Sequence, residues 1–249
     1  MKLYTYCRSQ ASFRVRIALN LKGITREDSF LHLEKGDQFA DAYRAINPQM
    51  VVPTLIDCDV KLYQSLAILE YLDEKHPEPP LLPTDPQARA WVRGLALINV
   101  ADSHPLIVPR VRHYLTDVLK VSDDQRLAWI QHWLGAGLEA IETLLAEHSS
   151  SGRFCHGESP TVADICLVTQ VTPAKTFNLS LDPYPRVMRV YDLHGHPGFR
   201  RCPPVKAARR GIGEFGQLLP DLLLLLQRPL SSRYVARAAH ERRCAFQLL

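Results

Sequence analysis

The pattern of apolar and polar positions divides the chain into a mixed first third and a helical remainder. Leu3 to Tyr6 is a short apolar run, which predicts a buried strand. The apolar residues from Phe13 to Leu21 then recur near helical spacing, and Gly23 stands where such a helix would end. Ser9 or Ser12 stands where an N-cap belongs. The opening stretch therefore predicts a strand that leads directly into a helix.

Beyond Gly23 the pattern predicts a weak strand, a polar link with helical patches, a two-stranded hairpin and an amphipathic helix. These segments cover residues 29–33, 34–46, 54–56 with 61–63, and 65–75. Ser65 is a natural N-cap for the last of them. Two helices of this first third thus begin where a strand has just ended. Cys7 continues the first strand, and its alternation favours a place in the core.

A proline-rich stretch, residues 77–86, separates this third from the helical remainder. Five prolines in ten residues exclude a regular helix or a central strand, so the stretch is the best candidate for a domain boundary. Helical periodicity then covers residues 88–119, 123–147, 161–177 and 184–193. Asp85 with Pro86 predicts one helix start, and Thr161 with Asp164 predicts another through a capping box.

Composition indicates a globular protein of the cytosol. The 249 residues are 46% apolar, no run of 18 apolar residues occurs, and the sequence opens in strand-like residues rather than a basic and apolar leader. The six cysteines include no CxxC pair and no metal-like spacing with histidine. We therefore expect reduced thiols, no metal site and no membrane span.

The net charge of +4 comes from the last 45 residues. Residues 205–249 carry eight Lys/Arg and three Asp/Glu, which leaves the preceding chain close to neutral. A near-neutral body gives no electrostatic reason to expect nucleic acid binding. The same tail contains five consecutive leucines, at 222–226, between Pro220 and Pro229. We expect residues 204–249 to be an atypical, poorly packed segment; a basic amphipathic helix on a membrane or partner is the rival interpretation.

Two local features predict chemistry at the strand ends. A helix N-terminus presents unpaired amides and a partial positive charge, which stabilise a bound anion or a thiolate. Val52-Pro53 precedes the third strand, and a cis bond there would leave the Val52 backbone free to pair with an extended ligand. A trans proline at a strand start is the commoner alternative.

Several motifs together resemble the cytosolic glutathione transferases, and the first of them is similar to the zeta class. The resemblance covers about residues 1–203 and is carried by residues 6–19 (YCRSQASFRVRIAL), Asn47-Pro48, Val52-Pro53-Thr54-Leu55, 64–72 (QSLAILEYL), 160–164 (PTVAD) and 182–185 (DPYP). It implies an α/β thioredoxin-like domain at 1–80 and an all-α domain at 87–203. It also implies a homodimer that binds glutathione.

The activity that the resemblance implies is a glutathione-dependent cis–trans isomerisation of a maleyl diacid in aromatic catabolism. The diacid would be maleylacetoacetate or maleylpyruvate, and the cofactor's thiolate would add to the double bond, allow rotation and leave. A general glutathione transferase that conjugates or dehalogenates small electrophiles is the alternative. A non-catalytic module with the same fold is a third hypothesis.

The resemblance also implies roles for particular residues. Ser9 matches the serine that activates the thiol, and Arg8 and Arg110 match cations that face the substrate carboxylates. Residues that would contact glutathione are Gln49, Val52, Pro53, Gln64, Ser65 and His104, with Met50 beside Gln49. Arg112, two residues from Arg110, could instead be the arginine that faces inward.

Some positions depart from the family pattern. The family's second serine and its cysteine are Gln10 and Ala11 here, and an asparagine of the bacterial relatives is Val108. An expected carboxylate-binding arginine is Thr176, and the adjacent Lys175 could replace it as a point charge without a bidentate fork. These departures affect the substrate site more than the glutathione site.

Overall fold

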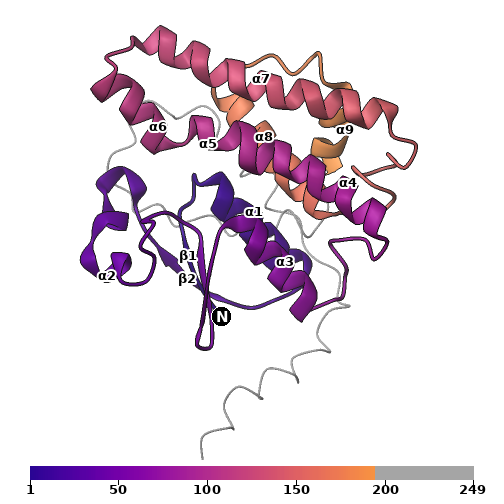
Figure 1. Ribbon diagram of the computed structural model, residues 1–249, viewed down its shortest axis with the longest axis horizontal. Coiled ribbons are helices and arrows are strands. Elements are labelled where there is room, and N and C mark those ends of the chain that lie inside the picture. Colours follow the sequence, from indigo (N-terminus) through magenta and orange to yellow (C-terminus); the bar gives the residue numbers. More distant parts are fainter. Residues whose placement is uncertain (194–249) are drawn as a thin grey trace, which may run out of the picture. The chain divides into compact units, whose positions relative to one another are not determined.

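The computed structural model describes residues 1–193, which belong to one compact unit, Met1–Cys202. Its first part contains a small sheet with helices and short helical turns (Figure 1). These elements are β1 (Lys2–Thr5), α1 (Gln10–Leu21), β2 (Glu27–Phe30), η1 (Leu33–Lys35), η2 (Asp37–Phe39), α2 (Asp41–Arg44), β3 (Thr54–Asp57), β4 (Val60–Tyr63) and α3 (Ser65–Lys75). The predicted atypical segment, 204–249, lies outside the described residues.

The sheet has the strand order β2-β1-β3-β4. β1 runs parallel to β2 and antiparallel to β3, which is in turn antiparallel to β4. A parallel pair needs a crossover, and α1 supplies it between β1 and β2. α1 and α3 pack together, and Leu3, Leu55 and Leu69 are among the buried residues that they and the sheet share. The expected thioredoxin-like α/β arrangement is confirmed.

The rest of the described chain is helical. Its elements are α4 (Pro86–Leu97), the π-helical turn η3 (Ile98–Ser103), α5 (His104–Ile107), α6 (Pro109–His113), the π-helical turn η4 (Tyr114–Val118), α7 (Asp123–Glu147), α8 (Val162–Thr176) and α9 (Pro185–Asp192). α8 contacts α1, and buried residues of both lie in one apolar cluster. No helix among residues 1–193 is long and apolar enough to cross a membrane.

The continuous helical pattern predicted for 88–119 is broken in the structure. Val108 is extended, with φ −66° and ψ 155°, because the residue before a proline avoids the helical region. Pro109 then starts α6, a helix of only five residues. The break places Arg110 and Arg112, the two candidate substrate-facing arginines, on a helix separate from α5.

The proline-rich stretch is fixed by one buried ion pair. Lys22 Nζ lies 2.8 Å from Asp73 Oδ1 and donates to the carbonyl oxygens of His76 and Pro79. The Asp73 carboxylate also accepts hydrogen bonds from the amides of Leu81 and Leu82, at 2.7 and 3.1 Å. The link between the two parts is therefore held by specific contacts with α1 and α3.

Candidate functional site

Three chain segments meet at one end of the sheet because of its register. Tyr4 near the end of β1 pairs with Thr54 at the start of β3, and Thr54 also pairs with Tyr63 at the end of β4. The residues after β1, before β3 and after β4 therefore lie next to one another. These are Ser9, Val52 and Ser65, which the sequence predicts as ligand-binding residues. The register thus brings the predicted site together from three separate segments.

Ser9 is the N-cap of α1. Its backbone is extended, and its Oγ accepts a hydrogen bond from the amide of Ser12 at 3.2 Å. A hydroxyl that accepts in this way still has its own proton to donate. Ser9 is half-buried, so a ligand can reach that proton. The chain therefore presents an O–H donor beside the positive end of a helix.

The loop that carries Ser9 is fixed by hydrogen bonds from Arg16, a residue for which no role was predicted from the sequence. The Arg16 guanidinium is buried and donates to the Thr5 side chain at 2.7 Å and to the carbonyl oxygens of Tyr6 and Cys7 at 3.1 and 3.3 Å. Cys7 itself is exposed, so the expectation that it lies in the core is wrong. β1 ends at Thr5, and the strand alternation does not extend to Cys7.

The segment before β3 is fixed by buried polar side chains. Asn47 Nδ2 and the Tyr43 hydroxyl both donate to the carbonyl oxygen of Val51, at 2.9 and 2.7 Å. The Val52-Pro53 bond is cis, the less common of the two alternatives considered from the sequence. Within residues 1–193, neither backbone group of Val52 is hydrogen-bonded to another residue. The chain therefore offers one peptide donor and one acceptor, the requirement for pairing with an extended peptide.

The start of α3 has an unusual backbone. Gln64, not Ser65, is the N-cap, because Gln64 has φ 66° and ψ 121° while Ser65 is already helical. A positive φ is strained for a residue with a side chain, and such strain is commonly found at binding sites. Gln64 Nε2 donates to Gln49 Oε1 at 2.8 Å, which brings together two of the predicted glutathione-binding residues.

A buried arginine lies beneath Ser65. Arg14 is 1% exposed; its Nη1 donates to Ser65 Oγ at 3.1 Å and its Nε donates to Thr169 Oγ1 of α8 at 3.2 Å. Its Nη2 is buried and has no hydrogen-bond partner in the described chain. Burial lowers the pKa of Arg14. The first turn of α3 thus lies over a positive charge, an environment suited to a bound carboxylate.

His104 lies near two arginines. It begins α5 and is half-buried, and burial together with the charges of Arg14 and Arg110 holds its pKa well below 6.5. The imidazole is therefore neutral at physiological pH. Arg110 itself is exposed, on α6. His104 and Arg110, both predicted as site residues, lie on the neighbouring helices α5 and α6.

This histidine predicts a pH dependence of stability. Below pH 6.5 the unfolded chain binds a proton at residue 104 that the folded chain does not bind, so the free energy of unfolding falls as pH falls. The slope contributed by one such group reaches about 1.4 kcal/mol per pH unit. We expect that the free energy of unfolding, measured with urea, falls less between pH 7 and pH 5 in His104→Asn than in the wild-type protein.

The matched control for that experiment is His113→Asn, which replaces an exposed histidine of the neighbouring helix. In this variant the free energy of unfolding should change with pH as steeply as in the wild-type protein. The pKa of His76 is also lowered by burial, and its contribution remains in both variants. Equal slopes for the wild-type protein and His104→Asn would contradict the prediction.

The predicted substrate cations lie in different surroundings. Arg8 Nη1 lies 2.7 Å from Glu34 Oε1, and both side chains are more than half exposed. Lys175 lies over the ring of Tyr191 in α9, 4.1 Å from its centre. Arg112 lies over the ring of Phe177 at 5.5 Å. Of the arginines on α6, Arg112 is half-buried and Arg110 exposed, so the alternative left open between them favours Arg112 as the one that faces inward.

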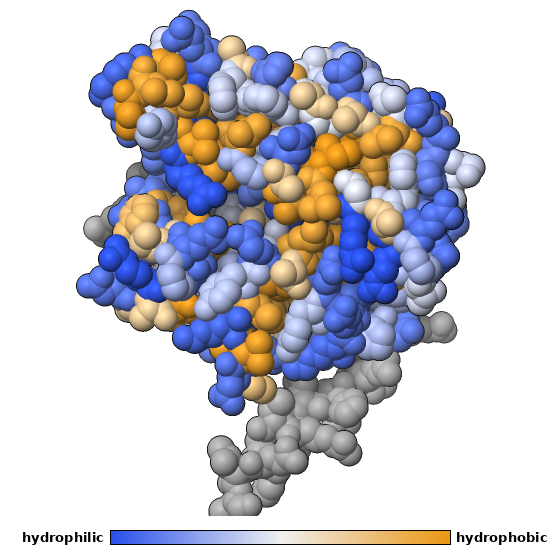
Figure 2. Space-filling view, in the orientation of Figure 1, coloured by the Kyte–Doolittle hydropathy of each residue, from blue (hydrophilic) through white to orange (hydrophobic). Residues whose placement is uncertain are grey.

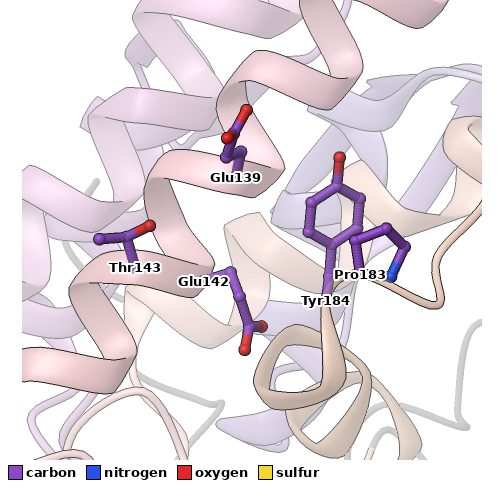
Figure 3. Close-up of a pocket in the computed structure, with 5 residues that line it drawn as sticks. All are labelled: Glu139, Glu142, Thr143, Pro183 and Tyr184. Atoms are coloured by element: carbon purple, nitrogen blue, oxygen red, sulfur yellow. The ribbon is translucent and has the colours of Figure 1, made fainter.

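A separate hollow lies between α7 and the segment before α9, and Figure 3 shows the side chains that line it: Glu139, Glu142, Thr143, Pro183 and Tyr184. Glu142 is already used there, because its carboxylate accepts from the amides of Arg186 and Val187 at the start of α9. This hollow is therefore part of the packing of α9. Among residues 1–193 no cluster of histidine, cysteine and carboxylate side chains could hold a metal ion.

Comparison with known proteins agrees with this geometry. The family described as Glutathione S-transferase, N-terminal domain, matches residues 3–80. A maleylpyruvate isomerase from Ralstonia sp is 43% identical over 205 residues, which are 82% of this chain and 97% of that protein. A maleylacetoacetate isomerase from Pseudomonas aeruginosa is 43% identical over 208 residues, which are 82% of this chain and 96% of that protein.

Solved structures give the same assignment. The holo structure of maleyl pyruvate isomerase, a bacterial zeta-class glutathione S-transferase, has a TM-score of 0.79 at 43% identity, covering 81% of this chain and 95% of that one. A maleylacetoacetate isomerase from Methylobacterium extorquens with bound malonate and glutathione has a TM-score of 0.79 at 42% identity, with the same coverage. The chain belongs to the zeta-class glutathione transferase and maleylacetoacetate isomerase family.

Proposed function

We propose that this protein is a glutathione-dependent cis–trans isomerase of a maleyl diacid, maleylacetoacetate or maleylpyruvate, in aromatic catabolism. The supporting observation is the meeting of the Ser9 hydroxyl, the Val52 backbone and the N-terminus of α3 at one end of the sheet. That arrangement suits an extended, anionic peptide with a thiol. Relatives are named as isomerases of these diacids. We also propose that the enzyme is a cytoplasmic homodimer. In each subunit residues 1–80 would form the glutathione-binding domain and residues 87–203 the substrate domain.

The residues fit glutathione by their donor and acceptor groups. Ser65 and Gln64, over the buried charge of Arg14, would hold the γ-glutamyl carboxylate. The unpaired N–H and C=O of Val52, held in place by the bond to Pro53, would pair with the cysteinyl backbone. Gln49 and Met50 would flank the glycyl end, and His104 would lie near the glutathione.

Bound glutathione would supply a thiolate, the nucleophile whose reversible addition to the cis double bond beside the substrate carbonyl permits rotation about that bond. Ser9 would donate a hydrogen bond from its hydroxyl group to the sulfur, and together with the α1 N-terminus it would favour the ionised thiol. Arg8 and an arginine of α6 would hold the carboxylates and stabilise the negative charge that develops on the carbonyl oxygen. The family resemblance gives Arg110 for this role, and the burial of the two side chains favours Arg112.

The experiment is a spectrophotometric assay of the full-length protein with maleylpyruvate and with maleylacetoacetate, each with and without glutathione. We expect formation of the fumaryl product only when glutathione is present. Turnover that does not depend on glutathione, or none with either diacid, would contradict the proposal. Conjugation of a small chloroaromatic electrophile without any isomerisation would favour the alternative, a general transferase.

A further inference from the structure

Arg112, on α6, is half-buried and forms no ion pair with another residue of the described chain. Its Nε is inaccessible to solvent and has no hydrogen-bond partner among the described residues. Its guanidinium lies over the ring of Phe177, 5.5 Å from the centre, which holds the planar group in place without neutralising it. A half-buried guanidinium that makes no ion pair with a described residue is costly, because its charge has lost part of its hydration.

The charges around Arg112 come from two elements. Burial lowers the pKa of Arg112, the charge of Arg126 on α7 lowers it further, and the charge of Glu34 on η1 raises it. Arg126 already pairs with Asp123 at 3.0 Å. Glu34 is therefore the carboxylate whose field reaches Arg112.

Glu34 also pairs with Arg8. Their side chains form an ion pair at 2.7 Å, and the charge of Glu34 contributes, after burial, to raising the pKa of the Tyr6 hydroxyl to about 12. Arg8 comes from the loop after β1 and Arg112 from α6, so the charge of Glu34 acts on one arginine of the sheet part and one of the helical part. Figure 2 shows a hollow in the surface between the segments labelled α2 and α6 in Figure 1.

We infer that Arg112 binds a carboxylate of the diacid together with Arg8, and that Glu34 competes with the substrate for these two arginines. This inference rests on the proposed function and specifies how the substrate is bound. A substrate carboxylate at the Arg8 guanidinium would replace the Glu34 carboxylate and would also supply the unpartnered Nε of Arg112 with an acceptor. Phe177 orients the guanidinium for that contact. Arg112 is thus a substrate-binding residue, and Glu34 sets the affinity of the site.

The test uses malonate, which has two carboxylates and no double bond and therefore binds without turnover. Calorimetric titration of the glutathione-loaded protein should give a malonate affinity that falls about 10-fold or more in Arg112→Gln, since a charge-assisted hydrogen bond is lost. Arg112→Lys should retain only part of the wild-type malonate affinity, because the lysine ammonium is a point charge and lacks the planar fork of a guanidinium. Glu34→Gln should bind malonate several-fold more tightly than the wild-type protein.

Arg126→Gln is the matched control, because it removes an arginine that is close enough to affect Arg112 but already has a partner. It should not weaken malonate binding. In the isomerase assay Arg112→Gln should raise the KM for the diacid, leave the KM for glutathione unchanged, and not lower the melting temperature. A purely structural role would instead lower the melting temperature and change both KM values.

The outcomes separate the inference from the proposed function. Malonate binding that weakens in Arg112→Gln, in a protein without isomerase activity, supports the inference and contradicts the function. Isomerase activity with unchanged malonate affinity and unchanged diacid KM in Arg112→Gln overturns the inference alone. If Glu34→Gln binds malonate no more tightly than the wild-type protein, Glu34 does not compete with the substrate for the two arginines.

Discussion

Ser9→Ala is expected to lower the kcat/KM of isomerisation by about 10²–10³-fold, the usual effect of removing one donor that stabilises developing negative charge. The Ser9 Oγ already accepts a hydrogen bond from the Ser12 amide, so its proton is directed to a ligand. Without that proton, the sulfur of bound glutathione should ionise at higher pH. Two measurements check this: the pH profile of kcat/KM, and the ultraviolet absorbance of the thiolate in the glutathione complex.

Ser9 is also a helix cap, so the chemical effect must be separated from a structural one. Loss of the cap alone costs about 1 kcal/mol of stability. Ser9→Asp restores the acceptor for the Ser12 amide but has no proton to donate, so it should restore stability and not activity. Ser9→Thr keeps both functions and should retain substantial activity.

The matched control is Ser12→Ala. The Ser12 hydroxyl lies in the same turn of α1, is fully buried and has no hydrogen-bond partner among the described residues. Its removal should leave kcat/KM nearly unchanged and should not destabilise the fold. Near wild-type kcat/KM and an unshifted pH profile in Ser9→Ala would show that the sulfur is activated elsewhere.

Local patterns were sufficient to predict the elements that build the glutathione site. The apolar run before Ser9, the hairpin before Ser65 and the proline at 53 each give a signal within a few residues, and the sheet register then brings them together. The Asp85 cap, whose carboxylate accepts from the Ala88 amide at 2.8 Å, was predicted in the same way. Most of the strands and helices around the glutathione site could therefore be predicted from residues close together in the sequence.

The contacts that support the site were not predicted, because they join residues far apart in the sequence. No role was predicted for Arg14 or Arg16, but both are buried and donate to other segments. One signal was present: the segment 13–19 is apolar except for these two arginines, so no solvent-facing stripe remains for them. The pairing of Arg8 with Glu34 has no comparable signal, because Glu34 lies in an irregular polar link.

Positions fixed by backbone dihedrals also escaped the sequence analysis. Ser65 is the better N-cap by residue type, yet Gln64 takes the cap position with a positive φ. The break at Pro109 is a similar case. The cis form of the Val52-Pro53 bond was one of two alternatives considered, and the sequence alone did not decide between them, because the isomer depends on how the surrounding chain packs. These local departures coincide with the candidate site, where sequence rules are most often overridden.

The second large effect is expected for Asp164→Ala, which should lower the free energy of unfolding by about 3–5 kcal/mol, the usual cost of leaving buried polar groups without their charged partner. The Asp164 side chain is fully buried and accepts from the Thr161 amide at 2.7 Å, the Thr161 hydroxyl at 2.6 Å and the Cys155 amide at 2.7 Å. Removing it leaves three donors unsatisfied in the core that α8 shares with α1. Urea unfolding at neutral pH measures the loss.

Asp123→Ala is the control, because Asp123 also lies in the first turn of a helix but is exposed, where it pairs with Arg126. Its removal should cost about 0.5 kcal/mol. Burial raises the pKa of Asp164 more than its hydrogen bonds lower it, so ionisation of this carboxyl opposes folding at neutral pH. The stabilisation therefore comes from the acceptors that the carboxyl provides. Asp164→Asn, which keeps one carbonyl oxygen, should accordingly lose less than Asp164→Ala, and equal losses in the two variants would contradict this account.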